Sequence, residues 1–391
     1  MITVTEALDA LFTLAAPLET EEVPLLSAAG RVLRADVVAG RDQPPFAASA
    51  MDGYAIAEAA PGESVKVIGE SAAGHGFSGI VRAGEAVRIF TGAPMPAGAT
   101  RVVIQEDVVR DGDRATLRTI DAATHVRAAG TDFTTGARMS APRRIGPNDL
   151  ALLAAMNAGH VRVTRRPRVA LIATGDELVM PGELPGSDQI VASNTFGLHA
   201  LLCELGAEPR MLPVARDDAA ALGSVLGLVD DADLVITVGG ASVGDHDLVA
   251  TVAEERGLDR AFYKVAMRPG KPLMAGRLGA AMMIGLPGNP VSAMVCGHVF
   301  VAPVIRALLG LGAQPAPRRR APLAQDLPAN GPREHYMRAR LGGSGLDVFE
   351  RQDSALLTVL NEADALAIRP PHDPARRAGA ELDYLPLRTG A

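Results

Sequence analysis

The chain has 391 residues, of which 48% are hydrophobic and 21% charged, as is typical of a globular protein of roughly two to four domains. Its net charge of −7, its aromatic content of 3% and its lack of tryptophan argue against nucleic acid or an anionic membrane as a partner. The N-terminus has no leader pattern and no uncharged run is long enough for a bilayer, so we expect a cytoplasmic protein. Cys203 and Cys296 are expected to be buried free thiols in a reducing compartment.

The first predicted element is a helix over residues 3–16. Thr3 and Glu6 have the spacing of a capping box, and the apolar residues after them repeat at steps of three and four. A second helical stretch, Asp149–Ala158, belongs to a segment that we expect to pack beside this helix. Residues 1–46 plus 139–166 would then form one discontinuous domain.

Between these two segments, the sequence pattern of residues 47–138 predicts a β-rich inserted module. Short strand-like runs occupy Val65–Ile68, Ala86–Phe90 and Arg101–Ile104. Asp111-Gly112 stands between further apolar runs and predicts a hairpin.

From Pro167 the pattern alternates between strands and helices, which predicts an α/β domain with a largely parallel sheet over residues 167–314. The expected strands are Arg168–Ala173, Glu208–Val214, Leu234–Val238 and Ala281–Ile284. The expected helices are Thr195–Leu205, Ala219–Asp230, Leu248–Arg256 and Val291–Leu309. A Pro- and Arg-rich linker then leads to a strand-rich tail, which is expected to form a small β domain within residues 315–391.

Three predicted strands of the α/β domain end in loops rich in Gly and polar residues: Thr174–Leu178, Gly239–Asp247 and Gly285–Ala293. Ligands of open α/β sheets bind beyond the carboxyl ends of the strands. In the last loop, Asn289 can cap the following helix and Pro290 suits its first position, so free N–H groups there would attract a phosphate. The alternative for one such loop is an ordinary strand-to-helix turn, but three in one sheet favour a binding site.

Carboxylates accompany these loops, namely Glu177, Asp245 and Asp247, with Asp217 and Asp218 after the second strand. Carboxylates near a phosphate site suit Mg²⁺, a hard cation that prefers oxygen ligands. The competing interpretation is helix capping, which applies to at least one of Asp217 and Asp218 because a predicted helix follows them.

Only three of the 38 basic residues are lysines, and two of them, Lys264 and Lys271, flank Arg268-Pro269-Gly270. In a chain so biased toward arginine, this clustering indicates that both ammonium groups meet anions, rather than being solvated surface lysines. In the tail, Arg333, Arg338 and Arg340 are candidates for a second anion-binding cluster. For these arginines the sequence alone favours a solvent-exposed face.

Six segments taken in order resemble the molybdopterin molybdenumtransferase family, which includes the E domain of gephyrin-like proteins. They are Ser49–Ala55, Thr91–Pro96, Thr174–Leu178, Gly239–Asp247, Arg268–Pro272 and Gly285–Ala293. The resemblance extends over essentially the whole chain and is weaker from about residue 321. It implies a multidomain α/β protein: a discontinuous elongated domain, the inserted β-rich module, a central molybdopterin-binding α/β sandwich domain and a C-terminal β-barrel-like domain.

The resemblance also implies an activity in molybdenum cofactor biosynthesis. Adenylylated molybdopterin and molybdate would be the substrates, with Mg²⁺ or another divalent cation as cofactor. The adenylate would be cleaved, AMP would leave, and molybdenum would join the dithiolene. The family further implies a homodimer, in which the active cleft lies between the α/β domain of one subunit and the inserted module of the other.

Roles for individual residues follow from the same resemblance. Catalytic positions would be Glu177, Asp217, Asp247, Lys264 and Lys271, and the three acids would also bind the metal. Substrate-binding positions would be Asp52, Thr91, Thr174, Gly240, Ser242, Arg268, Pro272, Gly288, Asn289, Arg338 and Ser354. Two alternatives are a molybdopterin adenylyltransferase, which would use ATP, and a non-catalytic scaffold of the gephyrin kind.

Overall fold

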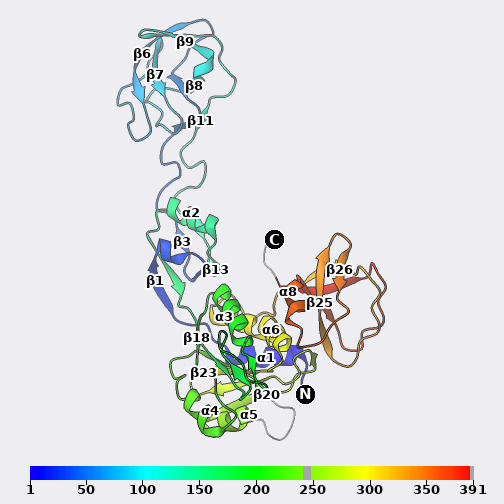
Figure 1. Cartoon of the computed structure of the whole chain (residues 1–391). Coiled ribbons are helices and arrows are strands. Elements are labelled where there is room, and N and C mark those ends of the chain that lie inside the picture. The colour runs from blue at the N-terminus through cyan, green and yellow to red at the C-terminus, as the bar shows by residue number, and fades with distance from the viewer. Residues whose placement is uncertain (241–247, 388–391) are drawn as a thin grey trace.

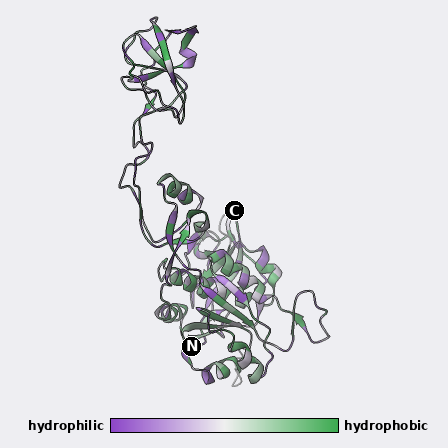
Figure 2. Cartoon of the chain, turned by 90° about the vertical axis from the view of Figure 1, so that its left-hand side faces the viewer, coloured by the Kyte–Doolittle hydropathy of each residue, from purple (hydrophilic) through white to green (hydrophobic). Residues whose placement is uncertain are grey.

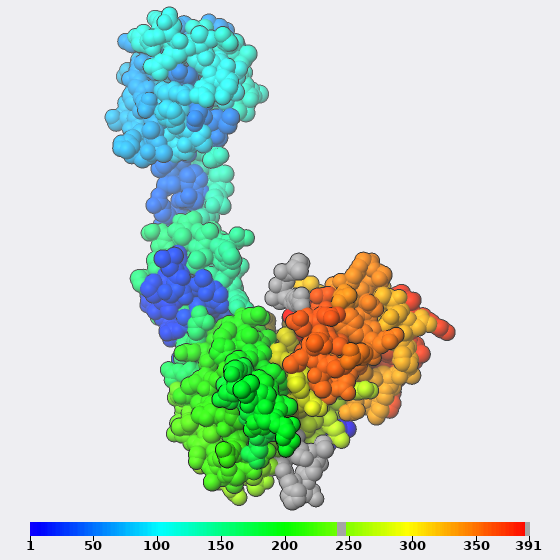
Figure 3. Space-filling model, viewed as in Figure 1, coloured from blue at the N-terminus to red at the C-terminus, as the bar shows by residue number. Residues whose placement is uncertain are grey.

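A computed structural model describes residues 1–240 and 248–387 as an elongated molecule (Figure 1). A β-rich module lies at one end of a narrow arm, and an α/β body lies at the other end. The C-terminal domain sits beside the body, as the space-filling view also shows (Figure 3). The multidomain α/β fold expected from the sequence is confirmed.

The N-terminal helix α1 (Val4–Leu14) begins at the predicted capping box. The backbone N–H of Glu6 donates to the Thr3 hydroxyl at 3.1 Å, and the Thr3 N–H donates to the Glu6 carboxylate at 2.8 Å. The expectation that this helix packs beside residues 139–166 is wrong. Its apolar stripe is buried instead in the core of the α/β body, where the helix contacts β20, β22 and α7.

The arm is built from two segments that are far apart in the sequence. Its sheet has the order β1-β14-β2-β13, with bounds Thr20–Pro24, His160–Thr164, Val32–Leu33 and Arg143–Arg144. It carries the short 3-10 turn η1 (Leu25–Ala28) and helix α2 (Pro147–Ala155). Two-residue pairs continue toward the module: β3 (Val37–Val38) with β12 (Arg138–Met139), and β4 (Ala48–Ser49) with β11 (Val126–Arg127). The outgoing and returning chains therefore run side by side along the arm.

The inserted module is a six-stranded sheet of order β8-β5-β7-β6-β10-β9. Its strands are β5 (Gly53–Ile56), β6 (Ser64–Ser71), β7 (Glu85–Ile89), β8 (Arg101–Ile104), β9 (Val108–Asp111) and β10 (Arg114–Leu117). The predicted hairpin is present, since Asp111 pairs with Arg114 across Gly112-Asp113. The 3-10 turn η2 (Gln105–Asp107) separates β8 from β9, so the apolar run before the hairpin forms two strands.

The α/β body contains a six-stranded sheet of order β18-β15-β19-β23-β22-β20. Its strands are β15 (Arg168–Ala173), β18 (Glu208–Met211), β19 (Leu234–Val238), β20 (Leu258–Tyr263), β22 (Met274–Leu278) and β23 (Ala281–Leu286). The first four in the sheet order are parallel and the last two are antiparallel. The largely parallel sheet predicted from the sequence is thus present, with two antiparallel strands added at one side.

Alternate residues of the central strands face two different cores, and helices cover both faces of the sheet. On one face, Leu171 and Ile236 pack with α1, α3 (Asn194–Leu205) and the helix that follows β23. On the other face, Ile172 and Val235 pack with α4 (Ala219–Leu226) and α5 (Leu248–Glu255). The hydropathy view, turned by 90°, shows hydrophobic residues on both helices and strands of the body (Figure 2). A sheet covered on both faces explains the nearly continuous apolar runs of its parallel strands.

The helix after β23 runs from α6 (Pro290–Cys296) through a π-helical turn (Gly297–Val301) into α7 (Ala302–Leu308). By length and composition, Pro290–Leu308 could cross a membrane, but 83% of its apolar window is buried inside the protein. It is accordingly a core helix of the body. Cys296 lies in it fully buried, and burial raises the pKa of its thiol.

Cys203 does not match the expectation of a buried thiol, because it is exposed. Helix α3 turns Leu198, Leu201 and Leu202 toward the core, so the next residue falls on its outer face. There its sulfur lies 3.7 Å from Nδ1 of His199.

The C-terminal domain shares its sheet with the body. The order is β21-β25-β27-β28-β24, and β26 also pairs with β25. The bounds are β24 (Arg319–Pro322), β25 (Glu334–Gly342), β26 (Gly345–Val348), β27 (Ala365–Arg369) and β28 (Glu381–Pro386), with helix α8 at Leu357–Glu362. The first strand, β21 (Met267–Arg268), comes from the body and runs parallel to β25. The two domains are therefore joined at the segment that carries Arg268.

An ion pair joins the arm to the α/β body, between Arg165, which follows β14, and Asp233, which precedes β19. Arg165 donates two 2.7 Å hydrogen bonds to the Asp233 carboxylate, and the Arg168 N–H donates a third at 2.8 Å. Burial acts to raise the pKa of Asp233, but these hydrogen bonds outweigh it and leave the pKa below its ordinary value. Its carboxylate thus stabilises the folded protein above a pH of about 4, and this contribution is lost as pH falls through the lowered pKa.

We expect Asp233→Asn to lower the free energy of unfolding by about 2–3 kcal/mol at pH 7, because the charged hydrogen bonds are lost. Denaturant titrations of both proteins, repeated at decreasing pH, check this. The difference between the two proteins is expected to shrink below a pH of about 4. An equal deficit at every pH would contradict the assignment.

Candidate active-site cavity

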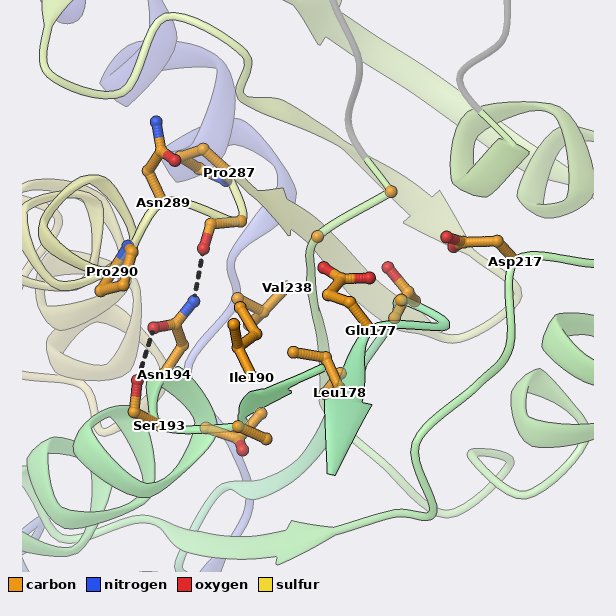
Figure 4. Close-up of a pocket in the computed structure, with 18 of the residues that line it drawn as sticks. Glu177, Leu178, Ile190, Ser193, Asn194, Asp217, Val238, Pro287, Asn289 and Pro290 are labelled. Carbon is orange, nitrogen blue, oxygen red and sulfur yellow. Dashed lines mark hydrogen bonds between the residues drawn. The ribbon is translucent and has the colours of Figure 1, made fainter. Parts of the chain in front are cut away.

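A cavity of about 1150 Å³ opens at the carboxyl ends of the parallel strands (Figure 4). Its walls come from the loops after β15, β19 and β23 and from the first turn of α3. Leu178, Ile190 and Val238 form an apolar wall, where they lie next to one another in Figure 4. The cavity thus lies where ligands of open α/β sheets bind, as the loop pattern predicted.

The ends of β15 and β19 approach each other closely because Gly239 stands between them. Gly239 has φ +98°, and a side chain at this position would meet the Thr174 carbonyl oxygen at 2.5 Å. The Thr174 hydroxyl is buried and has no hydrogen-bond partner within residues 1–240 and 248–387. Thr174 and Gly240 both line the cavity, so a free hydroxyl is held at its edge.

Two of the predicted acids share the cavity. Glu177 and Asp217 both line it, and Figure 4 shows them on neighbouring loops. Asp218 has a different role, since its carboxylate accepts the Ala221 N–H at 2.7 Å and caps α4. Of the two adjacent acids, Asp218 therefore caps the helix, whereas Asp217 lines the cavity.

The other predicted residues of this edge, Ser242, Asp245 and Asp247, lie outside the described residues. Within the described part of the chain no group of three or more His, Cys, Asp or Glu side chains is arranged to hold a metal ion. Glu177 and Asp217 supply oxygen donors of the kind that Mg²⁺ prefers, and Mg²⁺ usually keeps several water ligands. The donor chemistry of these two residues fits a hydrated divalent cation.

The loop after β23 is hydrogen-bonded to α3 and to the C-terminal domain. The side-chain amide of Asn194 donates to the Gly288 carbonyl at 2.7 Å (Figure 4). Asn289 is the N-cap residue of α6, but its side chain makes no capping hydrogen bond. That part of the expectation is wrong, because its amide donates instead to the Ser354 hydroxyl at 3.0 Å, in the C-terminal domain.

The lysine segment is a closed loop. Lys264 N–H donates to the Leu273 carbonyl at 2.9 Å, and Val265 N–H donates to the Lys271 carbonyl at 3.0 Å, so the backbones of the two lysines lie side by side. Lys264 has a left-handed φ of +71°, which is unusual for a residue with a side chain and recurs at functional sites. Neither lysine lines the cavity, whereas Pro272, the next residue after Lys271, does. The loop therefore borders the cavity.

Arg338 contradicts the expectation of a solvent-exposed tail arginine. Its side chain is 0% exposed, and its Nη2 donates to the Asp353 carbonyl at 2.9 Å. Its Nε and Nη1 have no partner among the residues that the structure describes. Burial lowers the pKa of this guanidinium to about 10, so it stays charged at neutral pH. A buried charge with two free donors is costly unless an anion binds it.

Arg333 and Arg340 do not join Arg338. Arg340 is exposed and pairs with Glu362 at 3.1 Å, while Arg333 donates to the Met267 carbonyl at 3.4 Å. Besides burial, two nearby charges act on the pKa of Arg338: the Asp353 carboxylate raises it, and Arg268, its cationic neighbour, lowers it.

Sequence reasoning missed His335, which is directly opposite Arg268 on β21 and Arg369 on β27. Burial and then the nearby arginines, Arg268 first, lower its pKa to about 4, so it is neutral at pH 7. Its Nε2 is buried without a partner in the described part of the chain. Only the strand register reveals it, since nothing in the sequence aligns these segments.

Asp52 and Thr91 come together in the inserted module. The Asp52 carboxylate accepts the backbone N–H of Thr91 at 2.7 Å and its hydroxyl at 2.8 Å, which lowers the pKa of Asp52. The module lies at the far end of the arm from the body (Figure 1). Within one chain the pair is therefore remote from the cavity.

Comparison with known families gives one consistent result along the chain. Residues 2–157 match the MoeA N-terminal region (domain I and II), residues 170–307 match a probable molybdopterin binding domain, and residues 320–387 match the MoeA C-terminal region (domain IV). A relative from Nostoc sp., named molybdopterin molybdenumtransferase, is 36% identical over 94% of this chain and 89% of its own length. Molybdopterin molybdenumtransferase 2 of Mycobacterium tuberculosis is 37% identical over 82% of each chain.

The fold is similar to solved structures as well. The crystal structure of a molybdopterin biosynthesis MoeA protein from Pyrococcus horikoshii superposes with a TM-score of 0.84 over 100% of both chains, at 29% identity. A second structure of the MoeA protein from this organism gives a TM-score of 0.82 over 98% of this chain and 99% of its own. The similarity therefore covers all domains together.

Proposed function

Since this chain belongs to the molybdopterin molybdenumtransferase (MoeA) family, we propose that it transfers molybdenum from molybdate to adenylylated molybdopterin and releases AMP. The observation that carries this proposal is the cavity at the strand ends, which has an apolar wall, two carboxylates and a glycine-rich helix start. A flat pterin or adenine ring suits the apolar wall. Phosphates suit the loop of Gly288 and Asn289 rather than the first turn of α6, because Pro290 has no N–H and the Val291 N–H donates to the Ser354 carbonyl at 3.0 Å.

We assign the divalent cation to Glu177 and Asp217, together with Asp247 as the family resemblance implies. When bound, Mg²⁺ would neutralise charge on the phosphates of the adenylylated substrate. The chain's own contribution is to hold these phosphates between the acids and the loop that contains Gly288 and Asn289, at one side of the cavity.

We assign molybdate to the cationic side, a region beside the cavity that consists of Lys271, Arg268, Pro272, Arg338 and Ser354, with Lys264 at the base of the loop. Of these residues, Pro272 lines the cavity itself. Molybdate is a tetrahedral oxyanion, and a guanidinium donates to such oxygens in pairs. The two free nitrogens of Arg338 and its burial provide such a donor. The hydrogen bond from Asn289 to Ser354 joins this side to the phosphate side.

We also propose a cytoplasmic homodimer. The module that carries Asp52 and Thr91 is too far along the arm to reach the cavity of its own chain (Figure 1). In a homodimer, the module of a second copy would complete the cleft. Both cysteines are free, which agrees with a reducing compartment.

The purified protein, supplied with adenylylated molybdopterin, Mg²⁺ and molybdate, is expected to release AMP and form molybdenum cofactor only when molybdate is present. The same protein with molybdopterin and ATP is expected to yield no adenylylated product. Formation of that product would support an adenylyltransferase instead. Partner binding without turnover of the adenylate would support a scaffold.

A further inference from the structure

The side chain of Gln352 forms a clamp on the backbone of Arg338. Its Oε1 accepts the Arg338 N–H at 3.0 Å, and its Nε2 donates to the Arg338 carbonyl at 2.9 Å and to the Phe349 carbonyl at 2.7 Å. The amide thus uses its acceptor and its donors at once. The residue as a whole is half-buried.

The Gln352 side chain lies beside β25 at the point where β26 no longer pairs with it. Regular pairing between β25 and β26 ends at Ala339 and Val348, and only the Phe349 N–H still reaches the Arg338 carbonyl, at 3.1 Å. Beyond this point the chain leaves the sheet. The Gln352 amide then satisfies the Arg338 backbone in place of the missing strand residue. The position of Arg338 is therefore fixed by a side chain as well as by the sheet.

The same loop continues toward the cavity, which Ala355 lines. The Asp353 carbonyl accepts from Arg338 Nη2 at 2.9 Å. The Ser354 hydroxyl accepts from Asn289 at 3.0 Å, and the Ser354 carbonyl accepts the Val291 N–H at 3.0 Å. Residues 352–354 thus bind the buried arginine at one end and the start of α6 at the other.

From this geometry we propose that Gln352 is a positioning residue for oxyanion capture: it fixes Arg338 relative to Ser354 and the phosphate loop. This inference rests on the proposed function. A long guanidinium must be held in one geometry before two of its nitrogens can meet one tetrahedral anion. Gln352 provides that restraint without touching the anion.

Gln352→Met keeps the size of the side chain and removes its hydrogen bonds. We expect the KM for molybdate to rise by about tenfold, because a buried backbone group loses its partner and Arg338 its fixed position. The kcat for AMP release is expected to stay within about twofold, since the acids and the phosphate loop are unchanged. Gln325→Met is the matched control. Gln325 bonds the Val348 carbonyl in the same domain but makes no bond to Arg338, so its KM should stay unchanged.

A double variant separates positioning from general stability. If Gln352 acts through Arg338, adding Gln352→Met to Arg338→Met should weaken molybdate capture no further. Multiplying effects, an unchanged KM, or a fall in kcat alone would overturn the inference. If the methionine variant does not fold, Gln352→Glu, which retains the acceptor and loses both donors, takes its place. An unsubstituted enzyme without any molybdate dependence would remove the proposed function itself, which is a different outcome.

Discussion

Replacing Glu177 with Gln is expected to lower molybdate-dependent AMP release by a factor on the order of 10²–10³, the usual loss when one charge-stabilising group is removed. The substitution keeps size and hydrogen-bonding reach but removes the negative charge. The Glu177 carboxylate lies against Gly175, whose φ of +146° is a backbone conformation that residues with a side chain rarely adopt. This residue is thus placed at the edge of the cavity by backbone that only glycine allows, and Asp217→Asn should have a similar effect.

The neighbouring acid provides the control. Asp218→Asn alters the cap of α4, and asparagine caps a helix about as well as aspartate. We expect unchanged AMP release and a stability change below about 1 kcal/mol. The assay is AMP release against Mg²⁺ concentration. If Asp218→Asn reduced turnover as much as Asp217→Asn, the assignment of the cation to the cavity acids would be wrong.

Arg338→Met is expected to reduce turnover at limiting molybdate by at least about 100-fold, yet leave the protein as stable as before or more stable. The loss of turnover follows from removing the one fully buried cation at the proposed oxyanion side. The gain in stability follows because two guanidinium nitrogens without protein partners no longer have to be buried. Such opposite effects identify a group that is retained for binding.

Arg340→Met, on the same strand, is the comparison. Arg340 is exposed, and its ion pair with Glu362 is a surface contact, so turnover and stability should change little. Steady-state kinetics at several molybdate concentrations and denaturant titration of both variants decide the matter. A marked loss of stability in Arg338→Met with unchanged KM would show that the arginine serves the fold.

The α/β body was predictable because its signals are local. Strand ends at Ala173 and Val238 are marked by the change from apolar runs to glycine, and these ends fall where the structure places them. The parallel strands carry nearly continuous apolar residues because both faces of the sheet are covered. The cavity followed from those strand ends, since parallel strands bring their carboxyl ends to one edge.

Contacts between distant segments were not predictable in the same way. Arg338 is buried where β21 of the body joins the C-terminal sheet. Helix α1 packs on the body against apolar side chains that come from distant parts of the sequence. Likewise, Asn289 would cap α6 by propensity, but Ser354 lies within reach and takes its amide. Each difference arises where a tertiary partner competes with a local preference.

Diffraction from crystals soaked with adenylylated molybdopterin and tungstate, a heavy analogue of molybdate, tests most directly whether the acids and the cations form one site. We predict an anomalous tungsten peak within hydrogen-bonding distance of Arg338 and close to Lys271, and the adenylyl phosphate beside Gly288 in the same cavity. Nucleotide in the cavity with tungstate bound on an unconnected surface, or with no tungstate at all, would contradict the account.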